Sequence, residues 1–332
     1  MAQPPESAEP KFDPRAPFAE HSDGPTAGPG RGYKSDPPEP RGIDGFFTPP
    51  APFLTALPRH TWIRPWPGRR APPGPARPPR ARGQLPGYRY WVPRSVLFIH
   101  NDPTAPQALL GEMFAELGFT ADVFAVLDAD RPNDPFIRRE FPDTCAYDAI
   151  VLLGARWSAY DDRLPWLNNE ITAVLHALDA GRAVLGVCFG AQLLARALGG
   201  GVSRSPYPEI GWSEVYSSDP ALVPDGPWFQ WHFDRIAVPP GAIELARNDN
   251  AVQAFRAGRA LGVQFHPEVD QDLVDQWLKL DCDTDADLAR LGFDATDVRD
   301  RTAVEIDGAV RRLRQLVGGF VGLLDEQPAT VK

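Results

Sequence analysis

Cysteine is scarce in this chain, with only Cys145, Cys188 and Cys282 among 332 residues. An odd and sparse set of this kind does not form a disulfide framework, and it favours a reducing compartment such as the cytoplasm. No run of about 18 apolar residues occurs, so we expect neither a membrane-spanning helix nor a membrane partner. The first residues lack a basic segment followed by an apolar one, so no signal peptide is expected.

Other signatures are missing as well. The formal net charge of −10 argues against nucleic acid as the main partner. Neither a P-loop pattern nor an ATP-pyrophosphatase signature is present, so the chain carries no recognisable synthase domain of its own. No group of residues shows metal-ligand spacing, and we expect no metal or other cofactor.

Proline, in contrast, is abundant in the first part of the chain. Residues 1–93 contain 23 of the 38 prolines, and they carry 13 Lys and Arg against 8 Asp and Glu. Proline interrupts both helices and strand ladders, so this stretch is predicted to be a largely disordered N-terminal extension. Its aromatic residues could still let short pieces dock on the domain. Alternatively, part of it is a non-native extension from a start codon placed too far upstream.

After residue 93, strand-like and helix-like patterns alternate. Strands are predicted at 95–99, 123–126, 149–153 and 183–187, and helices at 105–117, 165–180 and 189–198. This alternation implies right-handed crossovers and a parallel sheet that is covered on both faces. A β-rich stretch follows at 213–265, then a helix at 270–280. The tail, 285–325, is predicted to form two amphipathic helices on which Arg311, Arg312 and Arg314 face solvent.

One cysteine lies between a buried strand and a helix. The sequence Gly186-Val187-Cys188-Phe189-Gly190 has the G-x-nucleophile-x-G spacing of a strand–turn–helix elbow. The N-terminus of the following helix favours thiolate over thiol, and its N–H groups, beginning with that of Phe189, can hold an oxyanion. A buried, inert cysteine is the usual alternative, but the two glycines and the strand–helix junction favour a nucleophile here. Cys145 and Cys282 have no such context.

A thiol nucleophile needs a base, and His266 is the best placed of six histidines. It ends the strand 262–266 and is followed by Pro267 and Glu268. A carboxylate two residues away can accept a hydrogen bond from the imidazole and fix its tautomer. His100 also ends a strand and could line the cleft, although its sequence context shows no partner.

Together these motifs resemble the class I, or triad, glutamine amidotransferase family, and most closely its free-standing GMP synthase-like members. The resemblance rests on Gly186–Gln192, on Gly262–Glu268, and on Pro208–Trp212 between them. It implies a flavodoxin-like three-layer αβα sandwich with a mostly parallel sheet, a β-rich excursion before the histidine, and a C-terminal helical tail. On this basis residues 94–280 are predicted to form the amidotransferase domain and residues 281–332 a helical extension.

The resemblance also implies a chemistry. Cys188, His266 and Glu268 would form a catalytic triad that hydrolyses the glutamine side-chain amide through a γ-glutamyl thioester. Gln192, Trp212 and His232 would bind substrate, although a histidine merely fixed by Asp234 is an equal alternative for His232. Phe189, Gly154 and Ala155 would form the oxyanion hole. Many members have Gly-Gly-Pro in the turn 154–156, so Ala155 and Arg156 depart from the pattern.

Three functions are compatible with these residues. The first is a glutaminase that releases ammonia for an acceptor on a separate synthase subunit. The second is a stand-alone hydrolase of γ-glutamyl amides or peptides that uses the same triad. The third is a non-catalytic regulatory module, against which the intact triad argues.

Overall fold

The computed structural model describes residues 84–85, 88–89, 93–280 and 288–326. Most of the predicted N-terminal extension therefore lies outside the described residues, as does Cys282. Within the described part, nine strands form one sheet in the order β4-β3-β5-β6-β11-β10-β9-β7-β8. These strands are β3 (Ser95–His100), β4 (Thr120–Ala125), β5 (Ala149–Leu152), β6 (Ala183–Val187), β7 (Gly201–Ser217), β8 (Gly226–Ala237), β9 (Ile243–Arg247), β10 (Val252–Ala257) and β11 (Ala260–Val263).

The sheet has a parallel and an antiparallel half. Strands β4, β3, β5, β6 and β11 pair in parallel, and their order is that of a flavodoxin-like doubly wound sheet. Strands β10, β9, β7 and β8 continue the sheet with antiparallel pairs. The sheet is therefore mixed, because the predicted β-rich excursion extends the parallel strands rather than standing apart from them. A short antiparallel pair, β1 (Gln84–Leu85) and β2 (Tyr88–Arg89), precedes it in the chain.

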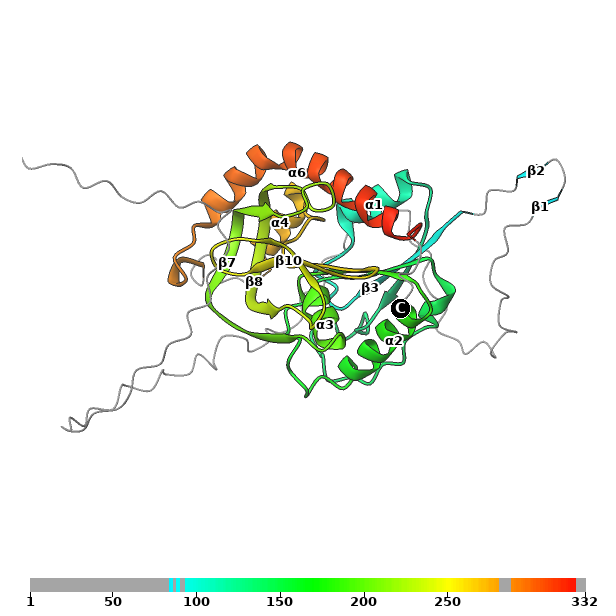
Figure 1. Ribbon diagram of the computed structural model, residues 1–332. Helices are drawn as coiled ribbons and strands as arrows, with labels where there is room; N and C mark the ends of the chain where they lie inside the picture. Colours follow the sequence, from blue (N-terminus) through cyan, green and yellow to red (C-terminus); the bar gives the residue numbers. More distant parts are fainter. Residues whose placement is uncertain (1–83, 86–87, 90–92, 281–287, 327–332) are drawn as a thin grey trace, which may run out of the picture. The chain divides into compact units, whose positions relative to one another are not determined.

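Helices cover both faces of the sheet, which confirms the predicted three-layer α/β fold (Figure 1). Apolar side chains of α1 and α6 pack on one face, and those of α2 and α3 on the other. The helices are α1 (Ala108–Glu116), α2 (Leu167–Asp179), α3 (Phe189–Ala197), α4 (Gln271–Trp277) and α6 (Ala295–Leu323), with a 3-10 helix η1 (Thr144–Ala146). Gly118 and Gly181 follow α1 and α2 with φ of 78° and 72°, as expected for glycines that end helices.

One strand differs from the prediction. Strand β7 begins at Gly201 rather than near residue 213, and its pairing with β8 is interrupted between Arg204 and Glu209. Pro206 and Pro208 lie in this interruption. Because proline cannot donate a hydrogen bond to a ladder, these residues are untypical of a strand, and the sequence did not predict the first part of β7. In the tail, the described residues contain one 29-residue helix, α6, preceded by helical residues 288–290.

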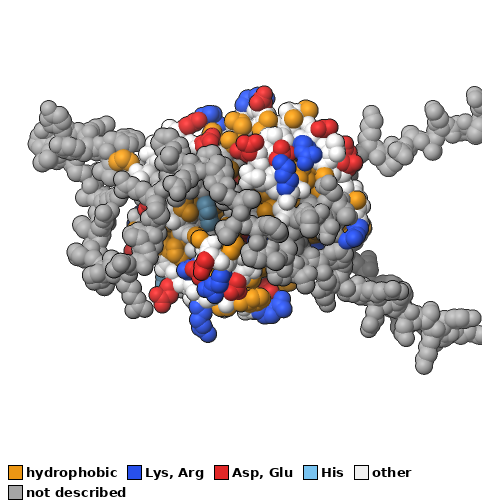
Figure 2. Space-filling view, turned by 180° about the vertical axis from the view of Figure 1, so that it is seen from behind, with side chains coloured by type: hydrophobic (Ala, Val, Ile, Leu, Met, Phe, Trp, Pro, Cys, Tyr) orange, Lys and Arg blue, Asp and Glu red, His pale blue; other side chains and the backbone are white. Residues whose placement is uncertain are grey.

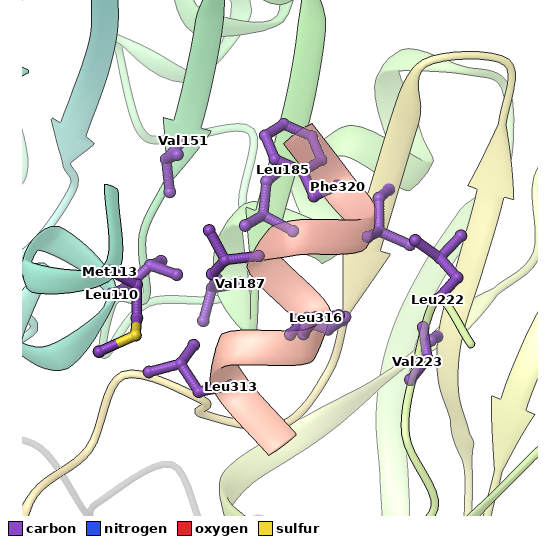
Figure 3. Packing of buried hydrophobic residues seen from close by; sticks show 14 of the residues in the cluster. Leu110, Met113, Val151, Leu185, Val187, Leu222, Val223, Leu313, Leu316 and Phe320 are labelled. Atoms are coloured by element: carbon purple, nitrogen blue, oxygen red, sulfur yellow. The ribbon is translucent and has the colours of Figure 1, made fainter. Parts of the chain in front are cut away.

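Helix α6 belongs to the core of this fold. Leu313, Leu316 and Phe320 are fully buried and point toward Leu185 and Val187 of β6, beside side chains of α1 (Figure 3). The predicted solvent-facing row on this helix is only partly correct. Arg311 and Arg314 are exposed, but Arg312 is half-buried, because its guanidinium lies 5.4 Å from the centre of the Trp228 ring and donates to the Pro227 carbonyl.

The described surface is mixed in charge. On the face seen in Figure 2, basic and acidic side chains are interspersed, with apolar side chains scattered between them. Among the described residues, no helix is both long enough and apolar enough to cross a bilayer.

Candidate active site

Cys188 occupies the sharp turn between β6 and α3. All five residues of β6 are buried, and the chain then enters Cys188 with φ 50° and ψ −108°. A positive φ is uncommon for a residue with a side chain and stores backbone strain. The turn is held because the Cys188 N–H donates to the Val263 carbonyl of the adjacent strand, at 2.9 Å. This is the strained geometry of a nucleophile elbow.

The two elbow glycines lie where a side chain would not fit. A Cβ on Gly186 would come 2.6 Å from the Gly190 carbonyl oxygen, and one on Gly190 only 2.2 Å from the Leu152 carbonyl oxygen. Such distances are far below ordinary contact. Helix α3 therefore approaches β5 and β6 closely enough to require glycine at both positions.

His266 lies near the same edge of the sheet. Strand β11 pairs in parallel with β6, with Val263 opposite Val187, so the chain leaves both strands at neighbouring points. The His266 N–H donates to the Phe229 carbonyl at 2.8 Å, and its Nδ1 lies 2.7 Å from Glu268 Oε1. Trp277 packs edge-on against the imidazole, with ring centres 4.8 Å apart. The ring is therefore fixed on several sides.

The electrostatics of this histidine link it to the cysteine. Burial by itself lowers the pKa of His266, but the Glu268 carboxylate and then the nearby Cys188 side chain outweigh burial and raise that pKa to about 10. With Nδ1 turned to Glu268, the Nε2 side of the ring is left for the sulfur. Cys188 Sγ also lies 3.8 Å from Gln264 Nε2 and 3.9 Å from the Trp231 carbonyl oxygen. The structure thus brings the three predicted triad residues together.

The residues predicted for an oxyanion hole flank this group. Phe189 is the first residue of α3, where helical geometry leaves backbone N–H groups without an intrahelical partner. Gly154 follows β5, and a Cβ added to it would lie 3.1 Å from His266 Cε1. Among the described residues, the N–H groups of Gly154 and Ala155 donate to no acceptor. Both sources of N–H groups therefore adjoin the triad.

Of the predicted substrate-binding residues, Gln192 lies next to the triad, whereas the polar atoms of Trp212 and His232 are bonded to other parts of the protein. Gln192 lies one turn along α3 from Cys188, and its side chain donates to Gln264 Oε1 at 3.3 Å and to the Asp234 carbonyl at 3.4 Å. Trp212, however, is buried, and its indole N–H donates to Thr302 of α6 at 2.9 Å. The only polar atom of the Trp212 side chain is therefore used inside the protein.

His232 is also buried, and it belongs to strand β8. Its Nδ1 lies 3.0 Å from the Asp234 carbonyl oxygen, and its Nε2 lies 3.2 Å from Gln230 Oε1 and 3.3 Å from Glu209 Oε2. Both ring nitrogens thus have protein partners. The Asp234 carboxylate, by contrast, accepts from the Ser158 hydroxyl at 2.6 Å.

His100, the other histidine at a strand end, is partly buried near Gln107. Burial of the ring lowers the pKa of His100 to about 4, and the nearby Gln107 side chain only partly offsets this effect. This imidazole is therefore neutral near pH 7.

The sequence did not point to Gln264 or Asp102, yet both lie at the site. Gln264 stands two residues before His266, and its side-chain amide lies 3.8 Å from the Cys188 sulfur. Its position in the same sequence motif as His266 could have indicated that it lies at the site. Asp102 follows β3 closely and contacts Arg156 in the turn that contains Gly154. A polar pair at a strand end, Asn101-Asp102, was the only sequence signal for it.

Comparison with known proteins agrees with this geometry. The family model described as "Glutamine amidotransferase class-I" matches residues 108–279. A GMP synthase (glutamine-hydrolyzing) from Aeropyrum pernix is 33% identical over 186 residues, which are 52% of this chain and 33% of the relative. A GMP synthase (glutamine-hydrolyzing) subunit from Sulfurisphaera tokodaii is 36% identical over 132 residues, or 37% of this chain and 68% of that relative. The chain therefore belongs to the class I glutamine amidotransferase family.

Solved structures support the same fold. A glutamine amidotransferase from Thermotoga maritima superposes with a TM-score of 0.59 at 26% identity, covering 70% of this chain and 99% of that one. A glutamine amidotransferase from Methylobacillus flagellatus superposes with a TM-score of 0.61 at 22% identity, over 73% and 99%. The chain spans only a third of the length of the Aeropyrum GMP synthase and 23% of one from Nostoc.

Proposed function

We propose that this chain hydrolyses the side-chain amide of glutamine at Cys188, with His266 as the base and Glu268 as the carboxylate that orients it. The observation that carries the proposal is the convergence of the three side chains: Glu268 lies 2.7 Å from His266 Nδ1, and Cys188 lies close enough to the same imidazole to raise its pKa. Glutamine is the proposed substrate because the curated relatives include glutamine-hydrolysing enzymes.

The geometry supports a two-step reaction. His266 takes the proton of the Cys188 thiol, the sulfur attacks the amide carbon, and the Phe189 N–H and N–H groups of the turn 154–155 bind the oxygen that becomes negative. His266 then gives a proton to the departing nitrogen, so that ammonia leaves and a γ-glutamyl thioester remains. A water molecule, deprotonated by His266, attacks the thioester carbon and releases glutamate and the free thiol.

The ammonia would pass to an acceptor on a separate protein. The Sulfurisphaera tokodaii relative, by its name, is one subunit of a GMP synthase, and this chain covers 68% of it. The chain itself has no P-loop or ATP-pyrophosphatase signature. We therefore propose that a partner subunit supplies the acceptor chemistry.

The catalytic unit that we propose includes more than residues 94–280. The family model ends at residue 279, but α6 supplies fully buried core residues next to β6. A fragment that ends before α6 would leave this apolar face uncovered. The helical extension is thus proposed as part of the working domain.

Release of glutamate and ammonia from glutamine by the purified full chain tests the proposal, with and without candidate synthase subunits. We expect Cys188→Ala to abolish release and Cys145→Ala, the matched control, to retain it. Activity that survives Cys188→Ala would refute the mechanism. A strong preference for γ-glutamyl conjugates over glutamine would instead support the stand-alone hydrolase.

Chemical labelling gives a second test that needs no acceptor. Burial, with Asp143 nearby, raises the pKa of the Cys145 thiol, whereas Cys188 lies beside the imidazole and at a helix N-terminus. A glutamine-analogue electrophile should therefore modify Cys188 well before Cys145 in the folded protein, as measured by peptide mass spectrometry. Equal labelling would contradict an activated thiolate.

A further inference from the structure

A buried carboxylate anchors the turn that follows β5. Asp102 has no exposed surface, and its Oδ2 accepts both the Arg156 backbone N–H, at 3.2 Å, and Arg156 Nε, at 2.7 Å. Its Oδ1 accepts the Thr104 N–H and hydroxyl at 2.9 and 2.7 Å, and lies 3.4 Å from Arg156 Nη2. Asp102 therefore joins the loop after β3 to the turn after β5.

This turn adjoins the proposed reaction centre. Gly154, two residues before Arg156, fits between His266 and Ala105, because a Cβ built on it would lie 3.1 Å from His266 Cε1 and 3.5 Å from Ala105 Cβ. The N–H groups of Gly154 and Ala155 have no acceptor among the described residues, so they are free to bind a substrate oxygen. A small rotation of the turn would change where both groups point.

The sequence of the turn explains why an anchor is needed. A proline at the third position of such a turn would fix its own φ and need no acceptor for an N–H. This chain has Gly154-Ala155-Arg156, whose third residue has a free φ and an N–H to satisfy. The Asp102 carboxylate meets both needs, because it binds the backbone and the side chain of Arg156 at once. Arg156 also reaches Asn133 Oδ1, at 3.0 Å.

We propose that Asp102 is a positioning residue that, through Arg156, holds the Gly154 and Ala155 N–H groups toward the oxyanion formed during glutamine hydrolysis. This inference rests on the proposed function. Asp102 does not touch the substrate. It acts on the charge that develops in the transition state, so its loss should lower kcat more than it changes KM.

Two reactions of Cys188 separate positioning from general damage. Hydrolysis of glutamine passes through a tetrahedral oxyanion, whereas alkylation by iodoacetamide occurs at a CH₂ carbon and forms no oxyanion. In the full chain, Asp102→Ala should lower kcat about 10- to 100-fold, as expected when a reacting group is displaced by a fraction of an ångström. The rate of Cys188 alkylation should stay within about twofold of the parent rate. Asp102→Asn, which keeps the volume, should show the same pattern with a smaller loss.

Two further variants complete the experiment. Asp128→Ala is the control, since it removes an aspartate that pairs with Arg131 and Arg139 at 2.7 and 2.5 Å outside the turn, and it should leave kcat unchanged. Arg156→Ala should lower kcat, and adding it to Asp102→Ala should cost little more, because both variants release the same turn.

The outcomes distinguish the two proposals. Unchanged kcat in both Asp102 variants, or equal losses of hydrolysis and alkylation, would overturn the positioning role while leaving the proposed function intact. Failure of the parent protein to hydrolyse glutamine would overturn both.

Discussion

Replacing Gly190 by alanine should damage the site more than its size suggests. The added Cβ would lie 2.2 Å from the Leu152 carbonyl oxygen and 2.6 Å from the Leu152 carbonyl carbon. An ordinary carbon–oxygen approach is about 3.3 Å, so α3 and β5 must separate by roughly 1 Å. The obstacle is backbone on a buried central strand, which cannot move aside as a flexible side chain would.

The displacement has two measurable consequences. Overpacking of this kind costs about 1–3 kcal/mol of unfolding free energy, which urea unfolding followed by circular dichroism would measure. The same shift moves Phe189 and Cys188, which precede Gly190, relative to His266. A misplacement of about 1 Å reduces kcat by roughly 100-fold, which a glutamate-release assay would detect.

A second glycine provides the control. Gly318 lies within α6, and a Cβ there would meet nothing within 4 Å. Gly318→Ala should therefore stabilise the protein by about 0.5–1 kcal/mol, through helix propensity, and leave kcat unchanged. If Gly190→Ala retained the stability and kcat of the parent, the close packing of α3 on β5 could not be the reason for the elbow glycines.

Three other predictions follow from named contacts. The pKa of His266 is raised in the folded protein to about 10, so its contribution to stability is full below about pH 6.5 and should be lost as the pH rises through 10. The urea concentration at the unfolding midpoint should therefore decrease between pH 6.5 and 10. Glu268→Gln should make this decrease smaller. Thr302→Val leaves the buried indole N–H of Trp212 unpaired and should cost about 1–3 kcal/mol by urea unfolding; a raised KM for glutamine would show that Trp212 serves the substrate after all. Gly154→Ala places a Cβ 3.1 Å from His266 Cε1, and this imidazole is already held by Glu268, so kcat should fall about tenfold in the glutamate-release assay. An unchanged kcat would show that the imidazole can move away from the added methyl group.

The parts of the site that could be predicted from sequence are local. Cys188 and His266 each follow a short buried strand, and parallel strands of one sheet bring such ends to a common edge, so two motifs were enough to expect their meeting. Gly118 and Gly181, which end helices, were also predictable, because the positive φ that favours glycine is set by the neighbouring residues of the helix end.

What could not be predicted depends on contacts between distant segments. Nothing near Trp212 indicates that its indole would donate to Thr302, and nothing near Asp102 indicates that it would hold Arg156. These contacts follow from how loops and helices pack once the sheet exists. Arg312 was expected in solvent because a sequence pattern does not reveal that Trp228 lies beneath it.

The position of α6 in the core has a consequence for biosynthesis. Strand β6 and Cys188 are made well before α6, yet the apolar face of the sheet around Leu185 and Val187 is covered only when Leu313, Leu316 and Phe320 arrive. A chain still on the ribosome would therefore hold an unfinished core until residues 313–320 are made, and such exposed surface attracts chaperones. The surroundings of Cys188, which belongs to the same cluster, would then be completed only after α6 is made.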